Sequence, residues 1–346
     1  MEFRKLGRTN IDVSLLGLGT MTWGFQNTEA QGHEQMDYAF DQGINFFDTA
    51  EMYAIPPTAD TYGKTEEIIG SWFASRKNRD KIILASKIAG PGLPWIREGN
   101  NKIDRENITL AVEHSLKRLQ TDYIDLYQLH WPNRGSYHFG QQWKYSPQFD
   151  TQLVEANFIE VLETCNELIT AGKIRHIGLS NETAWGTMKW LQLSEKYNLP
   201  RMVSIQNEYS LLNRQFEPDL QEIALHENCG LLAWSPLSRG ILSGKYLDGA
   251  RPEGSRLGLD SRKEHRDRPQ TENAVRDYIS LAKKYHLDVC QMAIAFVNSR
   301  PFVTSTLIGA TTMAQLKTNI EAINVHLSED VLNDLEKIRQ DHPMPY

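Results

Sequence analysis

Four residues of different chemistry stand at or near the ends of short apolar runs. Asp48 follows the second such run, Lys87 the third and His130 the fourth, and Tyr53 lies five residues after Asp48 in INFFDTAEMY. If the runs are strands of one parallel sheet, a carboxylate, an ammonium, an imidazole and a phenol converge at one edge. This group suits reduction of a carbonyl, because hydride added at carbon must be matched by a proton delivered to oxygen.

Each member of the group has a role in that chemistry. Tyr53 is the candidate proton donor, and a nearby Lys87 ammonium is expected to lower its pKa from the ordinary value of about 10. Asp48 keeps the lysine charged and oriented, and His130 hydrogen-bonds the carbonyl oxygen. Taken singly, each also has an ordinary explanation as a turn, packing, solvated or structural residue, so the prediction rests on their joint placement.

Lys87 also allows a second enzyme class, because a lysine ending a barrel strand can attack a carbonyl as the free amine in a Schiff-base aldolase. Asp48 argues against this, since a carboxylate partner keeps the lysine protonated.

The elements that must position these residues alternate regularly along the chain. A polar hairpin over residues 2–13 is followed by eight pairs of a short apolar run and a segment of helical periodicity, such as 105–119 with Asp104 as its cap. The expected strands are residues 15–18, 44–47, 82–86, 123–129, 174–179, 202–206, 230–234 and 303–308. Eight such pairs predict a single (β/α)8 TIM barrel domain over residues 1–346 with an N-terminal β-hairpin.

An open doubly wound sheet is the alternative to the barrel. Its dinucleotide fingerprint GxGxxG is not met, because Gly17 and Gly19 are followed by Thr22 instead of a third glycine. Four long connections, residues 54–63, 88–103, 131–152 and 237–270, follow predicted strands and are therefore expected on the C-terminal rim.

Composition excludes several classes of protein. The 346 residues carry a net charge of -7, and the Lys and Arg residues form no stripe of the kind that binds nucleic acid, so a nucleic-acid partner is not expected. Three scattered cysteines and no run of about 18 apolar residues predict a cytoplasmic protein without a membrane span. The ten histidines show no metal-ligand spacing, so no metal site is expected. Nothing in the sequence indicates the oligomeric state.

Seven segments resemble motifs of the aldo-keto reductase family and occur in family order: GLGTMTWG, INFFDTAEMY, SKI, DLYQLHWP, GKIRHIGLSN, IQNEYSLLNR and WSPLSRGILSGKY. The resemblance runs from about residue 6 to 330, and the family's catalytic tetrad falls on Asp48, Tyr53, Lys87 and His130. It implies an NADP(H)-dependent oxidoreductase that reduces aldehydes and ketones.

The resemblance also implies where the cofactor lies. Ser180, Asn181 and Gln206 are expected at the nicotinamide carboxamide, and Lys245 and Arg256 at the adenosine 2′-phosphate. The remaining contacts that it implies are Thr22, Asp48, Trp234, Ser235, Pro236, Leu237, Ser238, Gly309, Thr311, Gln315 and Asn319. In related sequences of the family a Glu often precedes the asparagine that corresponds to Asn319, whereas this chain has Thr318 at that position.

The small-molecule carbonyl substrate is expected to contact Trp23, Tyr53, His130 and Trp131. The connection 131–152 carries six aromatic residues, which suits a wall or lid over an apolar substrate but also an interface or a self-packed loop.

Potassium-channel β subunits also resemble this chain, so a nicotinamide-binding, redox-sensing regulatory subunit with slow turnover is a third possibility. Some of those subunits have asparagine where this chain has His130, which favours the reductase.

Overall fold

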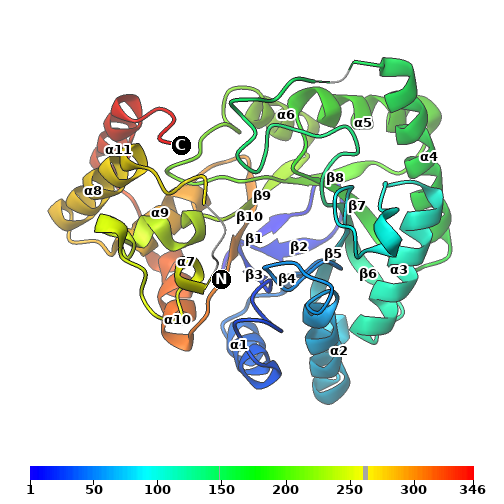
Figure 1. Cartoon of the computed structure of the whole chain (residues 1–346), viewed down its shortest axis with the longest axis horizontal. Coiled ribbons are helices and arrows are strands. Elements are labelled where there is room, and N and C mark those ends of the chain that lie inside the picture. Colours follow the sequence, from blue (N-terminus) through cyan, green and yellow to red (C-terminus); the bar gives the residue numbers. More distant parts are fainter. Residues whose placement is uncertain (148, 260–263) are drawn as a thin grey trace.

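Eight parallel strands close into a barrel in the computed structural model, which describes residues 1–147, 149–259 and 264–346 (Figure 1). The barrel order is β10-β3-β4-β5-β6-β7-β8-β9. The strands are β3 (Leu16–Gly19), β4 (Phe46–Asp48), β5 (Ile83–Ile88), β6 (Ile124–Leu129), β7 (Ile174–Ser180), β8 (Met202–Gln206), β9 (Gly230–Trp234) and β10 (Val303–Ile308). All eight predicted strands and the (β/α)8 TIM barrel class are therefore confirmed.

Strands β4 and β5 both reach farther than the sequence predicts. Asp48 is the last residue of β4 and pairs with Ala85, and Lys87 lies within β5, where it pairs with Gln128. The apolar runs end before the strands do, because the last inward-facing positions carry polar side chains. Of the three residues predicted to follow strands, Asp48, Lys87 and His130, only His130 lies beyond the end of its strand.

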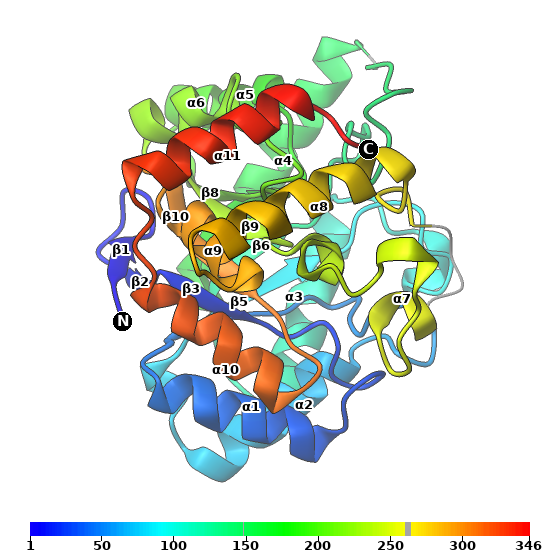
Figure 2. The ribbon, with the colours of Figure 1, turned by 90° about the vertical axis from the view of Figure 1, so that its left-hand side faces the viewer.

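Helices follow the strands and form the outer layer of the barrel (Figures 1 and 2). They are α1 (Glu29–Asp41), α2 (Lys64–Arg76), α3 (Arg105–Leu119), α4 (Thr151–Thr170), α5 (Ala184–Tyr197), α6 (Leu220–Glu227), α7 (Arg256–Leu259), α8 (Pro269–Lys284), α9 (Val289–Asn298), α10 (Met313–Glu321) and α11 (Glu329–Asp341). Asp104 caps α3 as predicted, since its carboxylate accepts from the backbone N–H of Asn107 at 3.1 Å. The C-terminal helix α11 packs beside α8 (Figure 2).

The N-terminal hairpin fills one end of the barrel. Its strands β1 (Phe3–Lys5) and β2 (Asp12–Ser14) pair antiparallel, as predicted. Leu6 and Val13 are fully buried in one cluster with Phe46, Ala85 and Leu126 from the barrel strands. Because this end is packed with apolar side chains, only the opposite, C-terminal end can hold a polar site.

The long connections lie after strands β4, β5, β6 and β9, and short helical pieces form within the second and the fourth of them. Residues 97–99 of the second connection form a 3-10 turn. In the fourth, residues 238–243 and 247–249 form short 3-10 turns, and α7 follows. Positions 148 and 260–263, which belong to the predicted connections 131–152 and 237–270, are outside the described residues. Among the helices that the structure describes, none has the length and apolar character needed to cross a membrane.

Candidate active site

Strand alternation explains how a polar layer comes to lie above an apolar one inside the barrel. Successive residues of a strand point to opposite faces, so positions two apart share a face. On β4, β5 and β6 this rule couples an apolar residue of the buried cluster to a polar residue one layer higher: Phe46 with Asp48, Ala85 with Lys87, and Leu126 with Gln128. The polar members meet at the C-terminal end of the barrel.

Asp48, Lys87 and Tyr53 form one connected group. Lys87 Nζ donates to Asp48 Oδ2 and to the Thr49 carbonyl, both at 2.7 Å, and lies 3.5 Å from the Tyr53 hydroxyl. The Lys87 side chain is 0% exposed and that of Asp48 only 4%. The structure therefore brings together the phenol, the cation and the carboxylate that the sequence separates by up to 39 residues.

The direction of the Tyr53 pKa shift differs from the sequence-based expectation. Burial of the phenol is the largest influence and raises the pKa, Lys87 lowers it, and Asp48 raises it further. The net result is a pKa above the ordinary value of tyrosine, whereas the sequence predicts one below it. The expectation was wrong in sign because desolvation of the phenolate exceeds the attraction of one ammonium that is itself paired with Asp48.

Lys87 stays protonated in this surrounding. Burial by itself lowers its pKa, but the Asp48 carboxylate and the Tyr53 hydroxyl outweigh that effect and raise the pKa above the ordinary value of lysine. An ammonium held this way is a hydrogen-bond donor and not a nucleophile.

His130 lies beside the phenol, with the two rings in an edge-on arrangement and their centroids 5.7 Å apart. Burial, and secondarily the Lys87 charge, hold the pKa of this imidazole well below its usual range. The ring is therefore neutral near pH 7. Its Nδ1 is buried and has no hydrogen-bond partner among the described residues.

Gln128 is a member of the site that sequence reasoning missed. Its Nε2 donates to Asp48 Oδ1 at 3.1 Å, and its Oε1 accepts from Gln206 Nε2 at 3.1 Å. Gln206 Nε2 also donates to Asp48 Oδ1 at 2.8 Å. Because β4, β6 and β8 are not neighbours in the barrel wall, these contacts cross the interior. The alternation that places Gln128 two residues before His130 could have identified it.

A cavity of about 540 Å³ opens above this layer. Most of the predicted site residues line it: Thr22, Asp48, Tyr53, His130, Trp131, Ser180, Asn181, Gln206, Trp234, Ser235, Pro236, Leu237, Lys245, Arg256, Gly309, Thr311, Gln315 and Asn319. Its volume falls within the range of small-molecule sites. Lys87, Trp23 and Ser238 are not part of this lining. Within the described ranges, no group of three or more His, Cys, Asp or Glu side chains could hold a metal ion.

Trp23 lies elsewhere than the sequence predicts. Its indole is 0% exposed and donates from Nε1 to Gln35 Oε1 at 3.0 Å. Gly32 of α1 packs so closely on the ring that a side chain at this position would contact it. Helix α1 covers it, so Trp23 belongs to the core between barrel and helix and does not reach the cavity as a substrate contact.

Ser238, predicted as a cofactor contact, also lies elsewhere than the sequence predicts. Its backbone N–H donates to the Ser235 carbonyl at 2.8 Å, and its hydroxyl contacts Ser210 Oγ at 3.0 Å. With both groups engaged inside the protein, Ser238 has no donor directed at the cavity. Arg239, the next residue, lines the cavity instead and was missed in the sequence.

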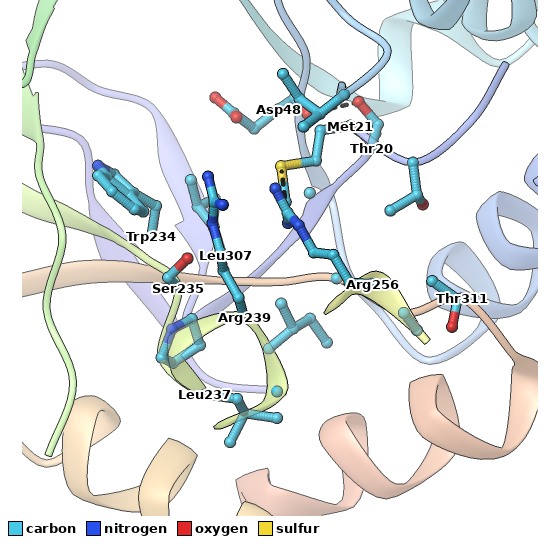
Figure 3. A pocket seen from close by; sticks show the side chains of 18 of the residues that line it. Thr20, Met21, Asp48, Trp234, Ser235, Leu237, Arg239, Arg256, Leu307 and Thr311 are labelled. Carbon is cyan, nitrogen blue, oxygen red and sulfur yellow. Dashed lines mark hydrogen bonds between the residues drawn. The ribbon is translucent and has the colours of Figure 1, made fainter. Parts of the chain in front are cut away.

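Two guanidinium groups project into the cavity between Trp234 and Met21 (Figure 3). Arg239 Nη1 is paired with Glu264 at 2.7 Å, and Arg256 Nη1 lies 3.7 Å from Met21 Sδ on the opposite wall. Both groups bring guanidinium N–H donors to this side of the cavity, and such donors suit an anionic ligand.

At the barrel mouth, Ser180 and Asn181 are held by other site residues. Ser180 Oγ donates to the Gln206 carbonyl at 2.9 Å, and Asn181 Nδ2 donates to the His130 carbonyl at 2.8 Å. Neither caps the following helix, because Thr183 does so by accepting from Gly186 N–H. Asn181 Oδ1 is buried with no partner among the described residues, so it can accept a hydrogen bond from a ligand amide.

The far end of the cavity is formed at the start of α10. Thr312 is the N-cap, and Thr311 donates from both N–H and hydroxyl to Gln315 Oε1. Asn319 Nδ2 donates to the Gly309 carbonyl at 3.1 Å. Thr318, where related sequences often have Glu, also lines the cavity and brings no charge there.

Only two of the six aromatic residues in the 131–152 connection reach the cavity, and they form one wall of it. Trp131 lies 4.9 Å from the His130 ring and is anchored by a bond from Nε1 to the Pro91 carbonyl at 3.0 Å. Phe139 stacks on Trp234 at 6.1 Å and 22°. The prediction of an aromatic wall thus applies to this pair, while Phe149 is 92% exposed.

Comparison with known proteins gives concordant matches. The sequence model of the aldo/keto reductase family matches residues 15–340. The chain is 48% identical to "Protein tas" of Escherichia coli K12, an alignment that covers 100% of this chain and 99% of the relative. It is 34% identical to "Uncharacterized oxidoreductase YrpG" of Bacillus subtilis, covering 98% and 96%. It is 38% identical to "Aldo-keto reductase" of Babesia bovis, covering 69% and 88%.

Proposed function

This chain belongs to the aldo/keto reductase family of oxidoreductases, and we propose that it reduces aldehydes and ketones to alcohols with NADP(H), with Tyr53 as the proton donor. The observation that carries the proposal is the buried contact chain from Asp48 through Lys87 to the Tyr53 hydroxyl, which ends at the cavity. We treat residues 1–346 as one catalytic domain.

The residues of the site suit proton delivery to a developing alkoxide. Because burial raises its pKa, Tyr53 carries its proton at neutral pH. An alkoxide is a stronger base than a phenolate, so transfer from the phenol is favourable. Lys87 stabilises the phenolate that remains, at a distance of 3.5 Å. In this proposal His130, which is neutral and lies beside the phenol, donates a hydrogen bond to the same oxygen and so orients the carbonyl.

The volume and lining of the cavity support binding of an extended nicotinamide dinucleotide. Bound there, NADPH supplies the hydride. Asn181 Oδ1, which has no partner among the described residues, suits a carboxamide N–H, and the guanidinium donors that line the cavity suit phosphate groups. We assign Asn181, Ser180 and Gln206 to the carboxamide, and Lys245 and Arg256 to the 2′-phosphate. The other proposed contacts are Thr22, Trp234, Ser235, Pro236, Leu237, Gly309, Thr311, Gln315 and Asn319.

Two alternatives make different use of the same residues. A Schiff-base aldolase requires a neutral amine at Lys87, and the ion pair with Asp48 keeps that amine protonated. A redox-sensing regulatory subunit would retain its cofactor tightly and turn over slowly. We propose a cytoplasmic location on the basis of the cysteine usage, a small-molecule carbonyl as substrate, and no nucleic-acid or membrane partner.

The proposal is tested by NADPH oxidation with a panel of aldehydes, ketones and quinones, repeated with Tyr53→Phe. The variant keeps the ring and loses only the hydroxyl, so kcat is expected to fall by about 10²- to 10⁴-fold with unchanged NADPH affinity. Equal activity of the variant would refute the role of Tyr53. Borohydride trapping of Lys87 with a ketone would support the aldolase, and tight NADPH retention with negligible turnover on every substrate would support the regulatory subunit.

A further inference from the structure

Glu51 is a fully buried carboxylate two residues before Tyr53, and the proposed chemistry leaves it without a role. From the described residues it accepts four hydrogen bonds: from Arg97 Nη1 at 2.8 Å, Arg97 Nη2 at 3.0 Å, the Tyr62 hydroxyl at 3.0 Å and the Ala89 backbone N–H at 2.7 Å. A buried carboxylate is costly unless it is paired and hydrogen-bonded, and here both conditions are met.

Glu51 is hydrogen-bonded to the end of strand β5, the strand that carries Lys87. The Glu51 backbone N–H donates to the Lys87 carbonyl at 3.2 Å, and the Glu51 side chain accepts from Ala89, two residues farther along the chain. Glu51, which belongs to the same loop as Tyr53, is therefore hydrogen-bonded both to Lys87, within β5, and to Ala89, just after β5. This arrangement sets how the loop lies relative to the Lys87 side chain.

The Tyr53–Lys87 contact is sensitive to that placement. The distance from the Tyr53 hydroxyl to Lys87 Nζ is 3.5 Å, at the outer limit of a hydrogen bond. A shift of the loop by a fraction of an ångström away from β5 would separate the two groups. Misplacement of a reacting group by about 1 Å can cost about 10²-fold in rate.

Arg97 holds the Glu51 carboxylate in its orientation. It arrives from the connection between β5 and α3, has a side chain that is 9% exposed, and binds with two nitrogens on the two carboxylate oxygens. The planar guanidinium matches a carboxylate in this two-point geometry, and a lysine ammonium does not. The same connection contributes the Pro91 carbonyl that anchors Trp131. One segment thus supports both the Tyr53 loop and the aromatic wall.

We infer that the Glu51–Arg97 ion pair positions Tyr53 by locking its loop onto the end of β5, so that the phenol stays beside Lys87. Glu51 and Arg97 are positioning residues, because they act through Tyr53. The inference rests on the proposed function, since it presumes that Tyr53 delivers the proton.

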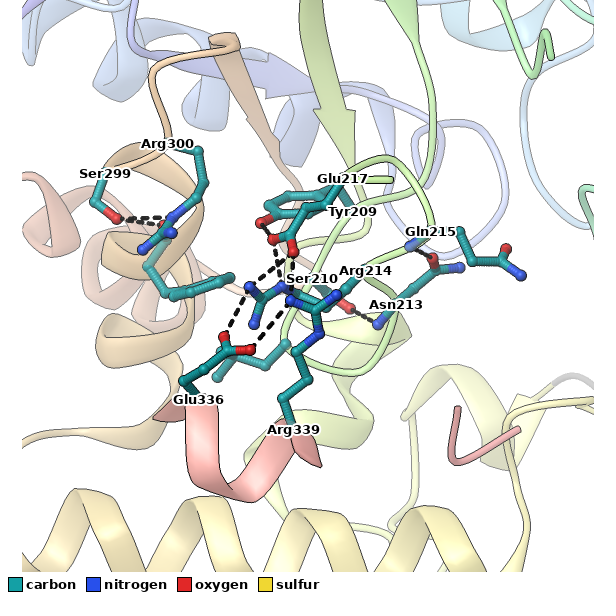
Figure 4. A network of polar contacts seen from close by, with 12 residues as sticks. Tyr209, Ser210, Asn213, Arg214, Gln215, Glu217, Ser299, Arg300, Glu336 and Arg339 are labelled. Carbon is teal, nitrogen blue, oxygen red and sulfur yellow. Dashed lines mark hydrogen bonds and ion pairs between the residues drawn. The ribbon is translucent and has the colours of Figure 1, made fainter. Parts of the chain in front are cut away.

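A matched control lies on another part of the barrel. Glu217 is also buried, accepts from the Tyr209 hydroxyl at 2.5 Å and from Arg214 Nη2 at 2.9 Å, and contacts Arg339 of α11 (Figure 4). It therefore repeats the combination of a buried carboxylate, an arginine fork and a tyrosine. Glu217 is not among the described residues that line the cavity.

The experiment compares Glu51→Gln, Arg97→Lys and Glu217→Gln with the unmodified enzyme, measuring kcat, KM, NADPH affinity and the solvent deuterium isotope effect on kcat. For Glu51→Gln we expect kcat to fall about 10- to 100-fold with unchanged NADPH affinity and an increased isotope effect, because proton transfer becomes slower. Arg97→Lys keeps the charge and is expected to lose about 3- to 10-fold, with the same change in isotope effect. Glu217→Gln is expected to lower stability only.

Two results would overturn the inference. One is a wild-type kcat and isotope effect in both Glu51→Gln and Arg97→Lys. The other is an equal loss of kcat in Glu217→Gln, which would mean that any buried ion pair has this effect. If Glu51→Gln does not fold, the milder Arg97→Lys variant decides between these outcomes. Failure of the proposed function itself is distinguishable, because the unmodified enzyme would then show no NADPH oxidation.

Discussion

Replacing Asp48 by asparagine tests whether the buried ion pair with Lys87 is the electrostatic centre of the site. In the structure Asp48 Oδ2 faces Lys87 Nζ at 2.7 Å, and Asp48 Oδ1 accepts from Gln128 and Gln206. An asparagine can keep its oxygen toward the two glutamines, but it then presents an N–H₂ group to the ammonium. The cation is left buried without a counter-charge.

The expected cost follows from burial. Both side chains of the pair are at most 4% exposed, and removing one partner of such a buried pair costs about 3–5 kcal/mol. Exposed pairs contribute much less. Lys5 and Asp12 form an ion pair at 2.9 Å with both side chains more than half exposed, so Asp12→Asn is expected to cost less than about 1 kcal/mol. The two substitutions make the same chemical change in different surroundings.

The loss of stability in Asp48→Asn should depend on pH in a defined direction. In the unmodified protein the folded-state pKa of Lys87 is raised, so its stabilising contribution is present below the unfolded pKa of about 10.4 and is lost as pH rises through the folded pKa. In Asp48→Asn, burial is no longer outweighed and that pKa falls below the unfolded value. The variant then gains stability as pH rises toward about 10.4, and its deficit shrinks.

Urea unfolding followed by tryptophan fluorescence at pH 7 and pH 9.5 measures both effects. The double variant Asp48→Asn with Lys87→Met removes both charges and is expected to recover most of the loss at pH 7, because no unpaired charge remains. A deficit under about 1 kcal/mol for Asp48→Asn, or a double variant as unstable as the single one, would refute the reasoning.

The remaining predictions concern the cavity. Lys245→Ala should weaken NADPH binding by about tenfold or more and leave NADH binding nearly unchanged, as measured by fluorescence titration, and equal losses for both would remove Lys245 from the 2′-phosphate site. Cys290 lines the cavity, and burial raises the pKa of its thiol to about 11, so alkylation should be slow at pH 8 and about tenfold faster per pH unit above it. Saturating NADPH should block this labelling, with Cys290→Ala as control, and labelling that ignores NADPH would contradict the proposed cofactor position.

The pKa of Tyr53 bears on how the proposed reductase works. A phenol with a raised pKa is a poor acid toward water, yet it keeps its proton until a strong base forms beside it. Lys87 limits the rise and stabilises the phenolate after transfer. In the proposed reaction, the site thus withholds the proton from solvent and releases it to an alkoxide. The same desolvation keeps His130 neutral and able to donate a hydrogen bond without carrying charge.

The sequence by itself determined the architecture and the identity of the tetrad candidates. Strand and helix follow from local periodicity, so eight alternating segments predicted a barrel, and polar residues at strand ends predicted which side chains meet at the rim. Asp48, Lys87 and His130 are the outcome of that rule, since parallel strands of a closed barrel bring their ends together whatever the loops do.

Only the tertiary structure decided how these groups behave and what supports them. The direction of the Tyr53 pKa shift, the place of Trp23 in the core and the engagement of Ser238 depend on which side chains cover each residue. Gln128 and the Glu51–Arg97 pair contact residues far away in the chain. Burial and such contacts arise from packing between elements, and local periodicity carries no record of which loop folds over which strand.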